Sequence, residues 1–574
     1  MTHGRAAILG LALALPCGAV AQTAEPVRLV LQITVDQLRG DLPLRYLDRF
    51  GDSGFRLLLE NGTVYTDGHH AHANTETIVG HTTLATGAHP AAHGMIGNVW
   101  FDHETGFTTY NIEDPRYRLV SAGADVDAET EIDPTQRAAR SEGRSPASIL
   151  VSTFSDELAI RTAGRARIFG VSIKDRGAVS MAGHAGKAFW FSKASGEFVT
   201  STYYYDAYPR WVDDWNARGL PASYGGTTWN LPADRSTFLF GDEDDREWET
   251  DLAGFGRTFP HDYGPAVGRY FSTLLTTSPA GDALTLDFTK ALIVAEQLGT
   301  DEVTDYLGVS FSSTDYVGHL FGPSSLESEV NLLHLDGVLA DLFAFVDEHV
   351  GLDRTLIVLS SDHGGPEVPG YLAELGVPAG YVEPDEWDRA PAIAALEERF
   401  GVGEALIETY AHPYVYLDND VVDTSGLERV EVEEAIAEEL MKFPGVALAL
   451  SSTALRRGAV AEMPLTRSVM NNFNPTRSGD VFVVFEPHWF INDFDGLTVA
   501  SHHGSPWRYD TFVPLIFSGP GVPARTVHRR VHTIDLAPTL ARFVGTGVPS
   551  GATGTPLVEV LAGRGSGASA RRDR

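Results

Sequence analysis

Carboxylate and imidazole side chains follow three apolar, strand-length runs of this sequence. They are Asp36, Asp315, His319, Asp362 and His363. Strands buried on both faces are typical of parallel sheets, and functional groups gather at the carboxyl ends of such strands. Carboxylates mixed with imidazoles are ligands that suit Zn²⁺. Taken singly, each position also fits a turn, a helix cap or an ion pair on a helix face, so both interpretations stay open for each residue.

A further stretch with candidate reactive residues runs from Asn74 to Asn98. It includes the hydroxyls of Thr75 and Thr77 near its start. The start of a helix presents free backbone N–H groups and the positive end of the helix dipole, which favour an anion. A threonine placed there could accept a phosphoryl group as a nucleophile, or it could cap the helix. The spacing to the turn at Gly80 favours Thr77 over Thr75 as the nucleophile.

Cations and a further histidine complete the candidate set. Lys174 and Arg176 follow the strand-like run 166–173. Together they could clamp an oxyanion, although such a pair is also typical of a solvated loop with acids nearby. His502 and His503 lie side by side in the sequence, and His503, which precedes Gly-Ser, is the better ligand candidate of the two.

Composition and charge limit the class of protein. The chain has 574 residues, 43% of them hydrophobic and 10% aromatic, which is enough for a substantial core. This length fits one large α/β domain with insertions, or about two to four ordinary domains. A formal net charge of −34 argues against non-specific binding to nucleic acid or to an anionic membrane. Cys17 is the only cysteine, so we expect no disulfide, cysteine ligand or cysteine nucleophile in the mature chain.

Residues 1–21 predict a secretory signal peptide. Arg5 precedes an apolar run over 6–15, and residues 19–21 form a small-residue cleavage site. The run is too short to span a membrane, so no membrane span is expected after cleavage. Lipidation at Cys17 is the alternative. The expected location is therefore a periplasm or the surrounding medium.

Strand-like runs alternate with helical patterns along the rest of the chain. The runs expected to form one sheet are 27–35, 166–173, 306–311, 355–361, 481–485 and 512–517. Apolar spacing predicts an amphipathic helix over 331–350, and the segment from Ile534 is expected to be a closing helix. Residues 186–280 are rich in aromatic and turn residues, and 367–467 in acidic helix formers, so both are expected to be insertions. The polar segment 563–574 is expected to be a disordered tail.

Motifs spread over nearly the whole mature chain are similar to those of the alkaline phosphatase superfamily. They are TVDQLRGD, TETIVGHTTLATG, GMIGN, SIKDRGAV, SSTDYVGHLFGP, SSDHGG and HHGSPWRYDTFVPLIFSGPGV. Within the superfamily, the chain resembles the PafA-like group of exported bacterial alkaline phosphatases that use threonine. The resemblance implies an α/β sandwich over 22–562, with a central, mostly parallel sheet, helices on both faces and inserted cap segments.

The resemblance also implies a role for each matching residue. Thr77 would be the nucleophile and phosphoryl acceptor, and Asn98, Lys174 and Arg176 would contact non-bridging phosphoryl oxygens. Two Zn²⁺ ions are the implied cofactors. Their implied ligands are Asp36, Asp362, His363 and Thr77 for one ion, and Asp315, His319 and His503 for the other.

The implied reaction is hydrolysis of small phosphate monoesters. A monoester dianion offers an oxygen to Lys174 and Arg176 where a diester carries an organic group. A nucleotide pyrophosphatase or phosphodiesterase of the same superfamily is the nearest alternative, and a secreted non-catalytic binding protein is the alternative from another class. The sequence leaves both a monomer and a dimer open. The other histidines near these motifs are expected to pack or to support ligands: His69, His70, His72 and His81.

Overall fold

The computed structural model describes residues 27–387, 390–402, 406–494 and 496–563. The expected signal peptide (1–21) lies outside these residues, as does all of the expected tail (563–574) except Gly563. Within the described ranges, no helix has both the length and the apolar character needed to cross a membrane.

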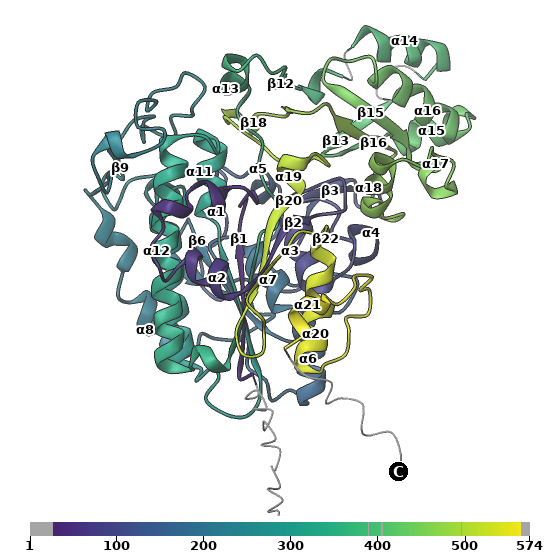
Figure 1. The fold of residues 1–574 in the computed structure, drawn as a ribbon. Coiled ribbons are helices and arrows are strands. Elements are labelled where there is room, and N and C mark those ends of the chain that lie inside the picture. The colour runs from purple at the N-terminus through teal and green to yellow at the C-terminus, as the bar shows by residue number, and fades with distance from the viewer. Residues whose placement is uncertain (1–26, 388–389, 403–405, 495, 564–574) are drawn as a thin grey trace, which may run out of the picture.

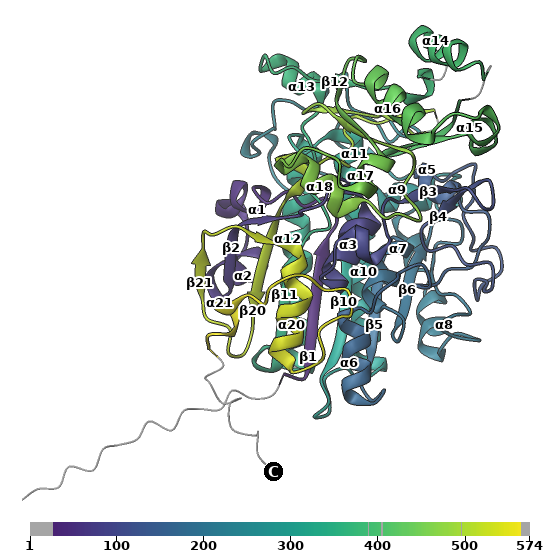
Figure 2. The ribbon, with the colours of Figure 1, turned by 90° about the vertical axis from the view of Figure 1, so that its right-hand side faces the viewer.

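A ten-stranded sheet forms the centre of the molecule (Figures 1 and 2). In order across the sheet, the strands are β21 (Arg525–Val527), β2 (Thr63–His69), β20 (Phe512–Ser518), β11 (Thr355–Ser360), β1 (Leu29–Val35), β10 (Asp305–Phe311), β5 (Ile168–Ser172), β6 (Lys187–Ser192) and β7 (Glu197–Val199), with β22 (Val531–His532) beside β2. The pairs from β11 through β6 are all parallel, whereas β20 runs antiparallel to both of its neighbours. The predicted α/β fold with a mostly parallel sheet is thus confirmed.

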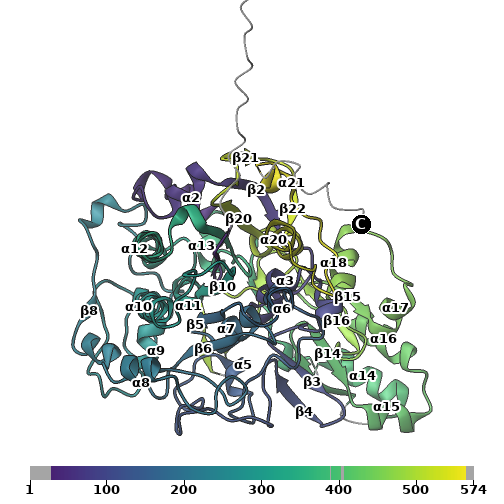
Figure 3. The same cartoon turned by 90° about the horizontal axis from the view of Figure 1, so that it is seen from below.

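Helices cover both faces of this sheet, as Figure 3 shows. Leu31 and Ile33 of β1 pack in one hydrophobic cluster with α10 (Pro279–Ala295) and α12 (Leu326–His349). Val30, which precedes Leu31 in β1, packs in another cluster with α3 (Thr77–Thr86), α6 (Phe154–Thr162) and α20 (Leu536–Val544). Successive side chains of a strand point to opposite faces, so a strand that is apolar at every position needs cover on both sides. The helices predicted from Asn331 and Ile534 are α12 and α20.

A separate lobe, drawn in green in Figure 1, has its own four-stranded sheet. Its strands, in order, are β13 (Ile407–Ala411), β14 (Tyr414–Leu417), β16 (Val481–Phe485) and β15 (Val446–Ser451), and α14 (Pro391–Phe400) and α16 (Arg429–Leu440) pack on it. The prediction that 481–485 returns to the central sheet was therefore wrong. Val483 packs under the lobe helices and Phe482 packs toward the main body, so this strand is apolar on both faces. A short continuous apolar run cannot distinguish such a strand from one in a parallel sheet.

The start of the expected insertion at 186–280 also differs from the prediction. Residues 187–199 form β6 and β7 at the edge of the central sheet. The residues that follow cover this edge, where α8 (Arg210–Asn216) places Trp215 edge-on to Phe198 at 5.2 Å. Phe198 in turn stacks on Phe288 at 4.2 Å. The aromatic residues of this region therefore extend the core.

Candidate active site

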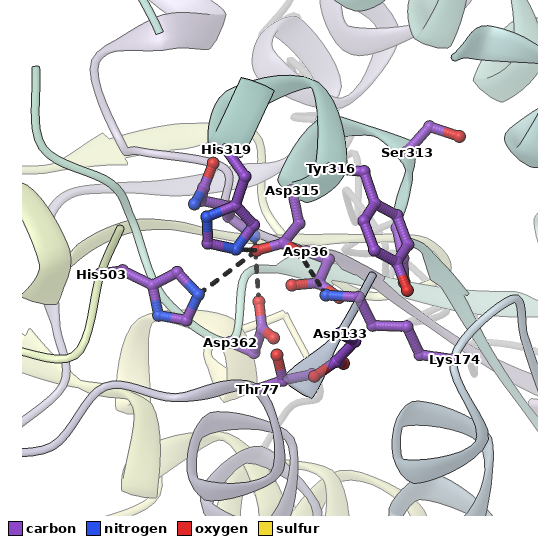
Figure 4. A network of polar contacts seen from close by, with 12 residues as sticks. Asp36, Thr77, Asp133, Lys174, Ser313, Asp315, Tyr316, His319, Asp362 and His503 are labelled. Carbon is purple, nitrogen blue, oxygen red and sulfur yellow. Dashed lines mark hydrogen bonds and ion pairs between the residues drawn. The ribbon is translucent and has the colours of Figure 1, made fainter. Parts of the chain in front are cut away.

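The residues singled out for chemistry meet at the carboxyl end of the central strands (Figure 4). Strand β1 runs parallel between β10 and β11, and the three strands end at the same edge. The residues that follow them are Asp36 after β1, Asp315 and His319 on α11 (Ser313–Phe321) after β10, and Asp362 and His363 after β11. All five are buried. The expectation that these groups share one rim is confirmed.

The first ligand group consists of Asp36, Asp362 and His363, whose ligand atoms all lie within 4.8 Å of one another. His363 Nε2 lies 3.5 Å from Asp36 Oδ1 and 3.4 Å from Asp362 Oδ2. The Nδ1–H of His363 donates to the carbonyl oxygen of Gly364 at 2.9 Å. Because a carbonyl can only accept, this bond leaves the lone pair on Nε2, which faces the two carboxylates.

The second ligand group consists of Asp315, His319 and His503. Asp315 Oδ1 lies 3.3 Å from His319 Nε2 and 3.4 Å from His503 Nε2, and Figure 4 shows the three side chains pointing toward one another. Each histidine donates its Nδ1–H to a backbone carbonyl, to Ser501 at 2.8 Å and to Thr75 at 2.8 Å respectively. Both rings therefore present Nε2 to the carboxylate, as ligand histidines do.

The donor set fits divalent metal ions. Central ligand atoms make no hydrogen bond to any described residue: Asp36 Oδ1, Asp315 Oδ1, Asp362 Oδ2 and His363 Nε2. They face other carboxylates and imidazoles at ion-pair distance instead. Buried polar atoms without hydrogen bonds are costly, and a cation between them would satisfy them. The mixture of carboxylate and imidazole in two adjoining groups is of the kind that zinc takes.

Thr77 is the first residue of α3, and it is buried. The N-cap residue is Glu76, whose side chain makes no capping bond, so the hydroxyl of Thr77 does not serve as the helix cap. The guanidinium of Arg176 lies 3.4 Å from Thr77 Oγ1. Thr75, the competing threonine, donates its hydroxyl to the carbonyl of Ser505 at 3.0 Å. Thr77 is thus the threonine that faces a cation.

Asn98 lies beside the first turn of α3. Its Oδ1 accepts the N–H of Ile78 at 3.1 Å, and its own N–H donates to Glu76 Oε2 at 2.8 Å. Glu76 also accepts the side-chain amide of Asn74 at 2.9 Å. The buried Glu76 carboxylate therefore ties the two ends of the 74–98 stretch together, a role that its place in the sequence did not indicate.

Lys174 and Arg176 stand at the start of α7 (Asp175–Ala182), and both are buried. The ammonium of Lys174 lies 2.9 Å from Asp36 Oδ2 and also contacts Asp315, bridging the two ligand groups. Burial alone would lower the pKa of Lys174, but the carboxylates of Asp315 and Asp36 raise it above its ordinary value, so the side chain stays charged.

Asp133 is the partner of Arg176, with Oδ2 at 2.7 Å from the guanidinium. Burial would raise the pKa of Asp133, but Arg176 lowers it well below its usual range. The Asp-Pro pair at 133–134 is a recognisable helix start, and Asp133 does cap α5 (Pro134–Arg137). Nothing in that signal indicates the ion pair, which depends on segments 43 residues apart in the chain.

His81 supports the site from inside α3, in line with the expected structural role. Its Nδ1 lies 2.9 Å from the carbonyl of Thr77 and 3.0 Å from Asp362 Oδ2, and its Nε2 lies 3.0 Å from Ser310 Oγ. It therefore links the nucleophile candidate to Asp362 of the first ligand group. His70 supports the same loop, with Nε2 donating to the carbonyl of Ser361 at 3.0 Å.

A cavity of about 700 Å³ opens over these groups. Its inner wall includes Asn98, Arg176 and Asp315. Its outer wall includes residues 410–412 of the lobe and residues 491–494, which follow the lobe strand β16 in the chain. The lobe therefore limits what can reach these groups.

Comparison with known proteins agrees with this geometry. The family model for type I phosphodiesterases and nucleotide pyrophosphatases matches residues 30–506. Alkaline phosphatase PafA of Elizabethkingia meningoseptica is 35% identical over 547 residues, which cover 93% of this chain and 94% of PafA. Alkaline phosphatase PhoV of Synechococcus elongatus is 32% identical over 545 residues, covering 94% of each chain. The crystal structure of wild-type PafA matches with a TM-score of 0.84 at 33% identity, covering 93% of this chain and 99% of that one.

These similarities extend over nearly the whole chain, so they include the central sheet as well as the lobe. The expected resemblance to the alkaline phosphatases is confirmed. The chain belongs to the type I phosphodiesterase and nucleotide pyrophosphatase family, in which it is an enzyme of the PafA-like alkaline phosphatase group, a phosphoric monoester hydrolase.

Proposed function

We propose that this protein is an exported, zinc-dependent alkaline phosphatase that hydrolyses small phosphate monoesters through a phosphothreonine at Thr77. One observation carries the proposal: Thr77 Oγ1 lies 3.4 Å from the buried guanidinium of Arg176, at the helix start beside two groups of metal-competent side chains. A hydroxyl, cations and two ligand groups at one site are what phosphoryl transfer to a side chain requires.

Asp36, Asp362, His363 and Thr77 would hold one zinc ion, and Asp315, His319 and His503 would hold the other. When bound, zinc lowers the pKa of a hydroxyl and stabilises a leaving oxygen. The carbonyl bonds to His363, His319 and His503 hold the imidazoles in the tautomer that ligation needs.

The remaining chemistry belongs to the chain's own groups. Thr77 Oγ1 attacks phosphorus, the bond from phosphorus to the ester oxygen breaks, and the alcohol leaves with a proton. Water then attacks the phosphothreonine, the bond from Thr77 Oγ1 to phosphorus breaks, one proton of the water passes to Thr77 Oγ1, and inorganic phosphate leaves. Asn98, Lys174 and Arg176 would bind the non-bridging oxygens in both steps. Asn98 lies beside the first turn of α3, Arg176 lies 3.4 Å from Thr77 Oγ1, and Lys174 contacts both ligand groups.

Lys174 and Arg176 favour monoesters over diesters. A monoester dianion has a third non-bridging oxygen for these cations, whereas a diester has an organic group in its place. A diester would therefore leave these two buried cations without the additional oxygen contact that a monoester supplies. The nucleotide pyrophosphatase or phosphodiesterase alternative therefore fits these residues less well.

Trapping the covalent intermediate tests the proposal. The zinc-loaded protein is mixed with excess p-nitrophenyl phosphate, quenched in acid and digested, and its peptides are analysed by mass spectrometry. We expect phosphate on Thr77 and none in the Thr77→Ala variant, with the Thr75→Ala variant still labelled at Thr77. Phosphate on Thr75, or unchanged turnover in Thr77→Ala, would overturn the proposed nucleophile.

Export is supported by the sequence of residues 1–21 alone. Release of these residues on secretion would give a mature chain that begins near Gln22, ahead of the first strand β1. Mass spectrometry of the protein recovered from the periplasm or the medium would show this new N-terminus. An intact N-terminus on cytosolic protein would contradict export.

A further inference from the structure

His502 lies in a cluster of imidazoles with His319 and His503. One ring nitrogen from each of the three lies within 4.8 Å of the other two. The ring centroid of His502 is 5.3 Å from that of His319 and 4.9 Å from that of His503. The Gly-Ser motif favoured His503 over its neighbour as a ligand, but the structure gives both a place beside the second ligand group.

Hydrogen bonding distinguishes His502 from the other two. The Nδ1–H groups of His319 and His503 are committed to backbone carbonyls, so their Nε2 lone pairs face the cluster. The Nδ1 of His502 is buried and has no hydrogen-bond partner within the described part of the chain. A buried ring nitrogen of this kind calls for a donor or a cation.

Packing alone does not satisfy this nitrogen. Phe494 lies edge-on to His502 at 5.0 Å and edge-on to His319 at 5.3 Å. These contacts bury the rings and limit their rotation. An aromatic C–H edge cannot replace the hydrogen bond that Nδ1 lost on burial, so the packing interpretation leaves a polar atom unpaired.

The position of the cluster points to a metal ion. His319, His502 and His503 line the same cavity as Asp315, whose Oδ1 also makes no hydrogen bond to the residues that the structure describes. Three imidazoles that bring ring nitrogens into one region leave those nitrogens without partners unless a donor or a cation lies between them. Imidazole is a common zinc ligand, and a zinc ion with four ligands can expand to five-coordinate to accept a reacting oxygen.

We propose that His502 is an additional ligand of the ion held by Asp315, His319 and His503. The inference rests on the proposed two-zinc function and adds a residue to it. The ion at Asp315 then has four protein side chains available, and the ion at Asp36 has three besides Thr77.

Chelator competition tests the assignment by metal content. The zinc-loaded wild type and the variants His502→Ala and His488→Ala are equilibrated with increasing chelator, and bound zinc is measured by elemental analysis. His488 is a matched control, since it is a partly buried histidine stacked on Tyr509 at 4.7 Å and outside every ligand group of the described residues. We expect His502→Ala to lose one of its two zinc ions at a free chelator concentration about tenfold or more below the one that the wild type requires. His488→Ala should match the wild type.

Wild-type stoichiometry separates the two possible failures. Fewer than two zinc ions in the wild type would contradict the proposed function. Two zinc ions in the wild type, retained equally by His502→Ala, would overturn only the role of His502.

A spectroscopic variant tests direct ligation if His502→Ala folds poorly. The only native cysteine, Cys17, lies in the expected signal peptide, so His502→Cys introduces a unique thiol into the mature chain. Loaded with Co²⁺, this variant should show a thiolate-to-cobalt charge-transfer band that the wild type lacks, because a cysteine thiolate can replace imidazole as a ligand. Loss of zinc in His502→Ala without this band in His502→Cys would overturn direct ligation.

Discussion

The backbone of Gly80 lies directly against the carbonyl of Asp362: a Cβ atom at Gly80 would be 1.8 Å from Asp362 O. Gly80 is in the first turn of α3, three residues after Thr77, and Asp362 belongs to the first ligand group. No side chain fits between them. This contact brings the helix that carries the nucleophile candidate against the loop that carries the ligands.

Replacing Gly80 with alanine should disable the enzyme without unfolding it. The added methyl group must move α3 away from Asp362, and a displacement of about 1 Å at reacting atoms costs on the order of 100-fold in rate. We therefore expect Gly80→Ala to lower kcat for p-nitrophenyl phosphate about 100-fold. Gly337→Ala is the control, because Gly337 is an exposed residue of α12 with no neighbouring atom within 4 Å of its Cβ position. Normal kcat in Gly80→Ala would contradict the geometric role of this contact.

Asp133→Asn should weaken monoester hydrolysis by releasing Arg176. The carboxylate and the guanidinium are 2.7 Å apart and both are buried. A hydrogen bond between charged groups contributes about 1.5–3 kcal/mol, which corresponds to a fall in kcat/KM of about tenfold or more. The exposed Asp234, which caps the short helix η3 (Arg235–Thr237), offers a matched control in Asp234→Asn. Equal kcat/KM values in Asp133→Asn and the wild type would show that Asp133 does not position Arg176.

Removing both cations should lower monoester hydrolysis far more than diester hydrolysis. In Lys174→Ala/Arg176→Ala, the third non-bridging oxygen of a monoester loses its partners, whereas a diester has no such oxygen to lose. We expect kcat/KM for p-nitrophenyl phosphate to fall at least about 100-fold, since two charged contacts are lost. The value for bis-p-nitrophenyl phosphate should change far less. A parallel fall for both substrates would mean that the cations act on structure or metal binding instead.

Stability should decline toward alkaline pH because of a buried acid outside the site. Burial, with the Glu327 carboxylate nearby, raises the pKa of Glu249 to about 9 from an ordinary value of 4.5. A carboxyl whose pKa is raised by folding stabilises the folded state below its unfolded pKa, and this stabilisation is lost as the pH rises through about 9.

Glu249→Gln should remove that decline. At pH 10 the variant should have a higher Tm than the wild type, by about 2 °C or more, and at pH 5 the two should be closer. Thermal unfolding at both pH values measures the difference. The exposed Glu247→Gln is the control. A Glu249→Gln variant that is less stable than the wild type at pH 10 would show that the carboxylate has a partner that it needs in its charged form.

Residues at strand ends were predictable because one local pattern places them. Asp36 and Asp362 each follow a buried apolar run, and parallel strands end at one edge. The ion pair of Asp133 with Arg176 was not predictable, because it joins segments that no local pattern relates. The strand 481–485 was assigned to the wrong sheet for the same reason, since being apolar on both faces does not reveal which partners cover them.

The most direct test compares a monoester and a diester on one zinc-loaded preparation, with and without chelator. We expect p-nitrophenyl phosphate to be hydrolysed at alkaline pH far faster than bis-p-nitrophenyl phosphate. EDTA should abolish the activity, and Zn²⁺ should restore it. Diester hydrolysis that equals or exceeds monoester hydrolysis, or full activity after complete metal removal, would contradict a zinc-dependent monoesterase.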